Sequence, residues 1–460
     1  MAALQPVPSA RAAQARAHGL AAAWVMLLSL VLGWLAVARP APLSAQSMGI
    51  AWAWSGAITP ESAVIVARLA NGVADARLVI APDRAGGESD ALTVPATGYQ
   101  KADANGLVRF EAGRLSPATR YRYRVETRAG QRLDGRLRTW FDGPFSFRIA
   151  FASCATTGSN SRVFDAIREL TPDLFVHMGD FHYLNIARND ARAFRRAYDR
   201  VLDSPRQSAL YRAVPIVYQY DDHDFGANNA DGTSPSRPAA TSVYRDHVPH
   251  YPLQPGAETI QQAFGIGRAR VIVTDTRTAR APVDSPQPRT MLGDAQRRWL
   301  EAELTRAKDA PLVIWVNTVP WITKANESTS EGWAPYAEER ERLATLIESL
   351  GLTRRLIMLS GDGHMAALDD GRNSAYMEGR TKDSRGFVVV HGAPLDRWTR
   401  VKGGPYSHGV SRRNHQFGLL DVADTGTALE VTASARDAYG QLVPGLELKL
   451  RCDKDGCQPR

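Results

Sequence analysis

Four predicted strands of this chain end directly in residues of the kind that bind metal ions. The four segments are 148–154 (RIAFASC), 174–183 (LFVHMGDFHY), 214–229 (VPIVYQYDDHDFGANN) and 356–364 (LIMLSGDGH). Each begins with a β-branched or aliphatic run, which is typical of a buried strand, and then breaks into Gly, Asp, His or Cys. Loops that leave the carboxyl ends of strands in an open α/β sheet line one crevice, so we expect these residues to meet there. The recurrence predicts a two-metal hydrolase.

The first 46 residues have the pattern of an export segment. Basic residues precede an apolar stretch from Gly19 to Ala38, and the small-residue segment 43–45 follows it. This is the order of a signal peptide that is cleaved near Ala45. The apolar stretch is also long enough to span a bilayer, so an uncleaved membrane anchor is the alternative. We therefore predict a periplasmic or secreted protein, with membrane contact only if the segment is retained.

The net charge of the chain limits the classes of partner that we expect it to bind. The net charge of +8 allows attraction to anionic substrates, nucleic acid or a membrane surface. However, the sequence has no run of five or six Lys and Arg residues, so we expect a solvated basic surface and no dedicated nucleic-acid binding. A length of 460 residues suggests two or three domains. The sequence does not indicate the oligomeric state.

Two regions with different patterns follow the export segment. Residues 47–143 contain short alternating segments separated by turn residues, which predicts an all-β domain of the immunoglobulin or fibronectin type. The string from Leu115 to Tyr121 (LSPATRY) resembles the corner of such sandwiches, in which the Tyr hydroxyl ties a strand to the preceding loop. Residues 144–460 alternate strands with helices, which predicts a layered α/β catalytic domain.

Residues that typically begin or end helices and strands predict where several of these elements lie in the second region. Asn160 or Ser161 can cap a helix that runs through Leu170. Further helices are predicted from 293–294 onward and from Pro335 to Gly351, and central strands at 270–274 and 311–317. The strand-like segments after residue 415 are expected to complete an outer sheet edge of the same domain.

Three cysteines follow the export segment. Cys452 and Cys457 flank a turn-like spacer that would allow them to pair in an oxidising compartment. Cys154 is left over, just past a strand. A lone cysteine is usually an inert buried thiol, but its position among the other strand ends favours a thiolate ligand.

The order of the strand-end motifs resembles that of the calcineurin-like metallophosphoesterases, and more closely that of the alkaline phosphatase D (PhoD-like) family. The motifs are a Cys after a strand, Gly-Asp-x-x-Tyr, Asp-Asp-His and Gly-Asp-x-His. The resemblance covers nearly all of the chain after the export segment and includes the strings at 54–56 and 275–277. It implies a layered sheet core of the metallophosphoesterase type, an αββα sandwich, preceded by the all-β domain.

The resemblance also implies a binuclear metal site. The residues implied for the first metal are Cys154, Asp180, Tyr183 and His364, with Cys154 at a position where relatives usually have an Asp. Asp180 is implied as a bridge to the second metal, which is completed by Asp362 and by an oxygen from the segment of Asp222, Asn228 and Asn229. We assign Asp222 and Asn229 to the metal and Asn228 to the substrate. Which of the three oxygens binds the metal stays open, because the spacing of this segment varies in the family.

The donor atoms themselves restrict the metals. A thiolate, a phenolate and a bridging carboxylate are all anionic, and together they favour Fe³⁺ at the first position. The second position is dominated by oxygen, which suits Ca²⁺, Mg²⁺ or Mn²⁺ better than Zn²⁺. The resemblance implies Ca²⁺ there. The predicted cofactor is therefore Fe³⁺ with Ca²⁺, with Mn²⁺, Mg²⁺ and Zn²⁺ as alternatives.

These residues predict an exported phosphoesterase that hydrolyses phosphate mono- or diesters. Two metals about 3.5–4 Å apart can clamp a phosphate and activate water. His223 is the predicted catalytic proton donor, with a purely structural His as the alternative. Arg277 is predicted to bind the phosphate, or else to be a salt-bridged scaffold residue. A phosphodiesterase or phospholipase-type enzyme and a non-catalytic surface binding protein are the competing functions.

Overall fold

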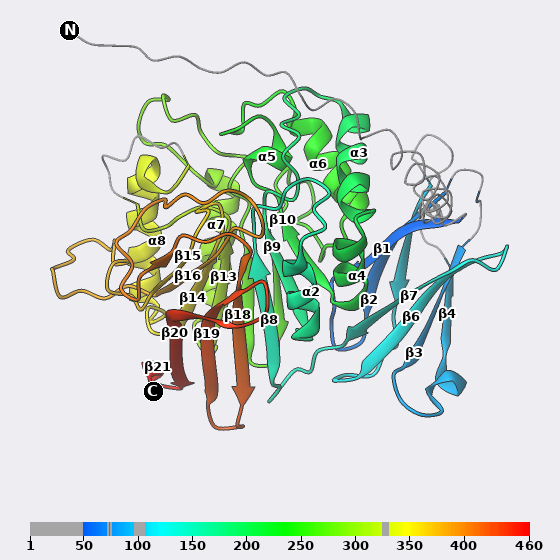
Figure 1. Cartoon of the computed structure of the whole chain (residues 1–460). Coiled ribbons are helices and arrows are strands. Elements are labelled where there is room, and N and C mark those ends of the chain that lie inside the picture. Colours follow the sequence, from blue (N-terminus) through cyan, green and yellow to red (C-terminus); the bar gives the residue numbers. More distant parts are fainter. Residues whose placement is uncertain (1–48, 71–72, 74–75, 96–105, 324–330) are drawn as a thin grey trace, which may run out of the picture. The chain divides into compact units, whose positions relative to one another are not determined.

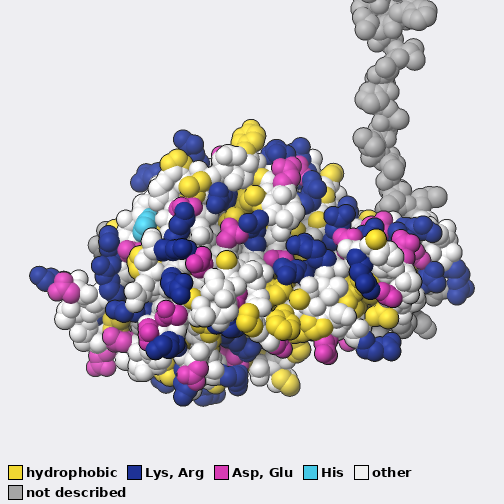
Figure 2. Space-filling view, turned by 90° about the horizontal axis from the view of Figure 1, so that it is seen from below, with side chains coloured by type: hydrophobic (Ala, Val, Ile, Leu, Met, Phe, Trp, Pro, Cys, Tyr) yellow, Lys and Arg dark blue, Asp and Glu magenta, His cyan; other side chains and the backbone are white. Residues whose placement is uncertain are grey.

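The computed structural model describes residues 49–460 except 71–72, 74–75, 96–105 and 324–330. The predicted export segment therefore lies outside the described residues. Among the helices that are described, none is both long enough and apolar enough to cross a membrane. On the face shown in Figure 2, Lys and Arg side chains are interspersed with Asp and Glu.

A ten-stranded sheet forms one half of the core (Figure 1). Its centre is three parallel strands, β8 (Phe147–Ala152), β9 (Leu174–Met178) and β10 (Ile216–Gln219). On one side the sheet continues through β18 (Gln416–Asp424), β19 (Leu429–Asp437), β20 (Leu442–Asp453) and β21 (Gly456–Pro459). On the other side it continues through β1 (Ile50–Gly56), β2 (Ala63–Leu69) and β5 (Leu107–Ala112).

A seven-stranded sheet forms the other half of the core. It is centred on parallel strands, in the order β12 (Ala269–Val273), β13 (Leu312–Asn317), β14 (Leu356–Ser360) and β16 (Val388–Gly392). Antiparallel strands flank them, namely β11 (Gln262–Ile266), β15 (Ala366–Asp369) and β17 (Val410–Ser411). The predicted strands at 270–274 and 311–317 are thus confirmed as β12 and β13.

Helices cover the outer faces of the two sheets. One buried apolar cluster contains side chains of both sheets and fills the space between them. A second cluster joins the ten-stranded sheet to α2 (Arg162–Glu169), α3 (Ala191–Leu202), α4 (Pro205–Ala213) and α6 (Arg237–His247). A third joins the seven-stranded sheet to α7 (Gly293–Arg306) and α8 (Ala337–Ser349). The layers therefore have the αββα order that the family resemblance implied.

The end signals in the sequence agree with the helix boundaries. The Ser161 side chain accepts a hydrogen bond from the Val163 backbone amide and caps α2. Pro335 lies in a single 3₁₀ turn, η2 (Ala334–Tyr336), immediately before α8. The last four strands complete the outer edge of the ten-stranded sheet as expected, and a disulfide between Cys452 and Cys457 joins β20 to β21.

The N-terminal region is all-β, but its strands divide between two sheets. A separate four-stranded sheet has the order β4 (Leu92–Pro95), β3 (Ala76–Pro82), β6 (Arg120–Thr127) and β7 (Arg132–Arg138). The other three strands extend the ten-stranded sheet through a parallel contact of Gly56 with Ile216. The expected corner is present, since the Tyr121 hydroxyl accepts from the Ser116 amide at 2.7 Å. An immunoglobulin or fibronectin type, and a boundary at residues 143 and 144, stay predictions.

The helix layer buries a histidine that makes stability depend on pH. The ring of His247 is fully buried 5.1 Å from the ring of Tyr198, and its burial lowers its pKa to about 3. In the unfolded chain this ring titrates near its ordinary pKa of about 6.5. At pH values between these two pKa values the unfolded state binds more protons than the folded state does. The free energy of unfolding therefore falls as the pH falls.

We expect a reduction of pH from 7 to 5 to cost the wild type about 2 kcal/mol more than a His247→Phe variant, which keeps a ring but cannot titrate. Urea unfolding of both proteins at the two pH values measures the difference. Equal pH dependence in the two proteins would contradict the assignment of His247 as a buried neutral ring.

Candidate metal centre

The four strand ends converge as the sequence predicted. Three sets of side chains have ligand atoms that all lie within 4.8 Å of one another, and Asp180 belongs to each set. The sets are Cys154, Asp180 and His364; Asp180, Asp222 and His223; and Asp180, Asp221, Asp222 and Asp362. The first and third sets correspond to the two predicted metal positions. Asp180 stands between them, as expected of a bridging carboxylate.

The backbone at this junction adopts a conformation that L residues seldom use. Cys154, Asp180, Asn229, Asp362 and His364 have φ angles of 64°, 55°, 62°, 53° and 48°. Left-handed backbone of this kind costs on the order of 1–3 kcal/mol per residue and is concentrated at functional sites. Hydrogen bonds between the strand ends hold it in place, including one from the Cys154 amide to the Gly179 carbonyl at 3.3 Å. These sharp turns lie at the strand ends whose Cys154, Asp180, Asp362 and His364 side chains form the clusters.

The first set combines a thiol, a phenol, a carboxylate and an imidazole. The Tyr183 hydroxyl donates to Asp180 Oδ2 at 2.6 Å and lies 3.1 Å from His364 Nε2. Burial raises the pKa of the Cys154 thiol well above its ordinary value, and the negative charges of Asp180 and Asp362 raise it further. A thiol in such surroundings ionises only if a cation binds to it.

The set for the second metal position consists of four carboxylates. Asp180 Oδ1, Asp221 Oδ2, Asp222 Oδ1 and Asp362 Oδ2 are buried and have no hydrogen-bond partner among the described residues. Burial raises the pKa of Asp180 well above its ordinary value, and the neighbouring carboxylates raise it further. Buried polar atoms are almost always satisfied by protein, water or an ion. Four unsatisfied oxygens at one point therefore fit a site for metal cations.

Two buried cationic side chains neutralise part of this charge. Arg277 Nε donates to Asp221 Oδ1 at 2.5 Å, and its Nη2 lies 3.7 Å from Asp222 Oδ1. Lys402 Nζ lies 2.7 Å from Asp362 Oδ1 and 3.0 Å from Glu331 Oε2. Burial alone would raise the pKa of Asp222, but the guanidinium of Arg277 and the His223 ring bring it below its ordinary value. Asp222 therefore stays ionised.

Arg277 occupies a different position from the one predicted for a substrate-binding residue. Its side chain is fully buried below the carboxylates and does not line the cavity that opens over the site. Its contacts are those of the salt-bridged scaffold that the sequence left as the alternative. Nε and Nη1 of this guanidinium donate to Asp221 and to the Ala230 carbonyl, and the remaining Nη2 is buried beside Asp222.

The cavity above the site has a volume of about 440 Å³. It is lined by Tyr183, His223, Asn228, Asn229, Glu331, His364, Arg397, Trp398, Arg400 and Lys402. All predicted residues that face it come from the strand ends or from the segment just after the Asp-Asp-His motif. The His223 ring lies 4.1 Å from the Tyr183 ring, and its Nδ1 is 2.5 Å from Asn185 Oδ1. His223 is therefore held at the cavity wall.

Sequence reasoning missed the segment 397–402, which contributes four residues to the cavity. Arg397 lies over the Tyr183 ring at 3.9 Å, and the exposed ring of Trp398 contacts His364 with 4.7 Å between centroids. The segment follows β16, whose carboxyl end lies beside that of β14. The charged residues Asp396 and Arg397, which follow this fifth strand after three apolar residues, were the available signal.

Comparison with known proteins identifies the family. Residues 149–426 match the family model of the PhoD-like phosphatase. The chain belongs to this family. No curated protein sequence gives a significant match. The membership makes the protein a phosphoric ester hydrolase, which is the activity that the motifs predicted.

Solved structures confirm the fold of this PhoD-like protein. A structure of PhoD aligns with a TM-score of 0.71 and 18% identity, and covers 90% of this chain and 92% of that one. A purple acid phosphatase, PPD1 from yellow lupin (Lupinus luteus) seeds, aligns with a TM-score of 0.62 and 13% identity, over 88% of this chain and 76% of that one. At these identities the likeness concerns the fold.

A Cys154→Ala substitution tests whether the first set binds a metal. We expect the variant to lose about one equivalent of bound transition metal per chain, together with thiolate-to-metal absorption, because it removes the sulfur donor. Elemental analysis and visible absorption of the purified protein measure this. The metal-free forms of the two proteins should melt at similar temperatures. Unchanged metal content and an unchanged spectrum would refute the ligand role.

Proposed function

We propose that the protein is an exported, metal-dependent phosphoesterase that hydrolyses phosphate mono- or diesters at a binuclear centre. The four unsatisfied buried carboxylate oxygens beside a buried thiol and a phenol carry this proposal. Membership of the PhoD-like family supplies the substrate class. The disulfide between Cys452 and Cys457 supports export, because such bonds persist in oxidising compartments.

The residues present fit two metal ions of different character. The residues for the first ion are Cys154, Asp180, Tyr183 and His364, and their anionic donors suit Fe³⁺. The residues for the second ion are Asp180, Asp222 and Asp362, and their oxygens suit Ca²⁺, with Mn²⁺, Mg²⁺ or Zn²⁺ as alternatives. Metal ions bound there would supply Lewis acidity and activate water for attack on phosphorus. Asn229 remains a candidate oxygen donor, since it lies in the cavity wall and its amide contacts Asp222.

Cationic side chains give the cavity its affinity for a phosphate group. Arg397 and Arg400 line the cavity beside Lys402, which ion pairs with Asp362 and Glu331 hold in place. Guanidinium groups bind phosphate oxygens through paired, charge-assisted hydrogen bonds. We therefore assign phosphate binding to this segment and to Asn228 rather than to Arg277.

His223 is the proposed proton donor to the leaving oxygen. The oxygen of Asn185 accepts a hydrogen bond from Nδ1 of the ring, which fixes the ring plane and directs Nε2 away from Asn185. A protonated Nε2 can then donate to the leaving group as the ester bond breaks. The Tyr183 phenol in the cavity wall and the buried Cys154 thiol are not alternative donors, because both belong to the proposed metal set.

One observation favours esters that carry an organic group on both sides, as in a phosphodiesterase or phospholipase. Trp398 is 55% exposed beside His364 and offers a flat apolar surface at the cavity. Such a surface suits packing against an organic group of the ester, and a diester offers a second organic group for this contact. A non-catalytic binding protein is the remaining alternative, and absence of turnover would support it.

Hydrolysis of an aryl phosphate and of a bis-aryl phosphate by the metal-loaded protein tests the proposal. We expect turnover of at least one ester, its loss on addition of a chelator, and its return on addition of Fe³⁺ with Ca²⁺. The ratio of the two rates gives the mono- or diester preference. If neither ester is hydrolysed by protein shown to contain metal, the phosphoesterase proposal fails.

We expect His223→Ala to lower kcat by roughly 10²-fold or more while bound metal stays unchanged, as removal of a general acid does. His408→Ala is the matched control, because His408 lies outside the cavity wall. An ester with a very acidic leaving group should be affected least, since its oxygen needs no proton. A rate equal to that of the control would leave His223 a structural residue.

A further inference from the structure

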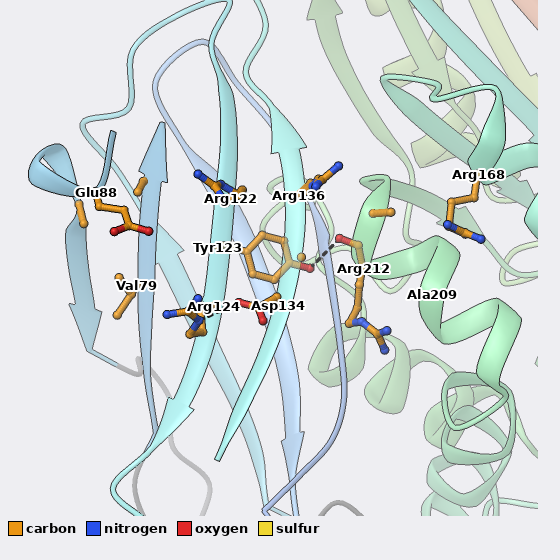
Figure 3. A pocket seen from close by; sticks show the side chains of 14 residues that line it. Val79, Glu88, Arg122, Tyr123, Arg124, Asp134, Arg136, Arg168, Ala209 and Arg212 are labelled. Carbon is orange, nitrogen blue, oxygen red and sulfur yellow. Dashed lines mark hydrogen bonds and ion pairs between the residues drawn. The ribbon is translucent and has the colours of Figure 1, made fainter. Parts of the chain in front are cut away.

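A second cleft lies where the four-stranded sheet meets helices α2 and α4 (Figure 3). Its volume is about 750 Å³, and none of its lining residues lines the catalytic cavity. The charged residues in its wall are Arg122, Arg124, Arg136, Arg168 and Arg212, with two carboxylates, Glu88 and Asp134. Figure 3 shows arginines that come from the sheet on one side and from the helices on the other.

The strand register places three of these arginines on one face of the sheet. Arg122 of β6 pairs with Arg136 of β7, and Arg124 pairs with Asp134. Side chains at directly opposite positions of two strands lie on the same face, and like charges there destabilise the sheet. The pair of Arg122 and Arg136 is therefore unfavourable unless an anion lies between or beside the two groups.

The existing acids neutralise only part of this charge. Arg122 lies 3.0 Å from Asp83, and Arg124 lies 2.7 Å from Asp134. No described residue forms an ion pair or hydrogen bond with the side chain of Arg136, which is exposed. The sheet thus contributes a guanidinium that is free to bind a ligand.

The neighbours of the two helix arginines, Arg168 and Arg212, also leave part of their charge or hydrogen-bonding capacity unsatisfied. Arg168 Nε is buried without a hydrogen-bond partner, and Asp165 is shared between Arg168 and Arg206. Arg212 donates to the neutral hydroxyl of Ser208 at 2.7 Å. Burial lowers the pKa of Arg212, and the positive charge of Arg168 lowers it further. Both groups would gain from a nearby anion.

Tight packing fixes the two sides of the cleft relative to each other. The Tyr123 hydroxyl donates to the Arg212 carbonyl at 3.3 Å. A Cβ atom at Gly135 would lie only 2.6 Å from the same carbonyl, so β7 approaches α4 at a distance that only glycine permits. A cleft with fixed walls loses little entropy when a ligand binds.

We propose that this arginine cleft binds a chain of two or more linked phosphate groups. Guanidinium groups match phosphate oxygens in geometry and charge. Arg136 belongs to the sheet wall and Arg168 and Arg212 to the helix wall of this cleft of about 750 Å³, so a ligand that contacts both walls must carry phosphate groups at more than one point. The occupant is therefore an oligophosphate rather than a single orthophosphate ion, and the cleft is a site separate from the catalytic centre.

Calorimetric titration of the metal-loaded full chain tests the proposal. The probe is methylenebisphosphonate, whose P–C–P bridge resists hydrolysis, and orthophosphate and sulfate are titrated in parallel. We expect saturable binding of the bisphosphonate, and an affinity at least about tenfold weaker in an Arg136→Ala, Arg168→Ala double variant. Adenosine 5′-(α,β-methylene)diphosphate shows whether the phosphate chain is recognised free or as part of a larger ester.

Arg132→Ala is the matched control, because Arg132 lies on the same strand, has the same charge and is outside the cleft. We expect less than a twofold change for this control. If the double variant is unstable, Arg136→Gln alone should still weaken binding several-fold, since that side chain is exposed.

Three results would overturn the proposal: equal affinity in the wild type and the variants, an equal loss in Arg132→Ala, or orthophosphate binding that is as tight as that of the bisphosphonate and is weakened equally by the double variant. Aryl phosphate hydrolysis measured on the same samples should be unchanged in all variants. Failure of the cleft proposal is thereby distinguished from failure of the phosphoesterase proposal.

Discussion

Repulsion among the carboxylates at the strand ends is the constraint on which the site depends. Asp180, Asp221, Asp222 and Asp362 place oxygens within 4.8 Å of one another in a buried position. Such a group is stable only if cations compensate it or some of its members take up protons. Arg277 and Lys402 compensate the outer members, at Asp221 and Asp362. The atoms that face the centre are left for metal ions.

The two-sheet fold explains how these charges are brought together. Parallel strands β8, β9 and β10 in one sheet and β14 in the other all end at the same junction. Apolar clusters between the sheets and under the helices hold this junction rigid. The burial of these clusters offsets the cost of the left-handed turns and of the desolvated acids. Strain and charge at the site are thus stabilised by packing elsewhere.

The strands of the N-terminal region belong to two different sheets. Three of its strands extend the ten-stranded sheet, whereas the other four form the sheet beside the arginine cleft. The seam between this region and the helices combines close backbone packing at Gly135 with arginines whose hydrogen-bonding groups are only partly satisfied. A seam that served packing alone would not need several arginines at its centre, which is why we assign it a ligand.

The sequence by itself predicted the layered α/β core and the convergence of the strand ends, and its motif order carried the resemblance to the phosphatase family, because strand periodicity and motif order are local properties of the chain. It also predicted the disulfide and the cap at Ser161. Only the tertiary structure decided the position of Arg277 below the carboxylates, the place of Lys402 beside Asp362 and the division of the N-terminal strands. These features depend on which residues distant in sequence share a low-dielectric space, and no local pattern records that.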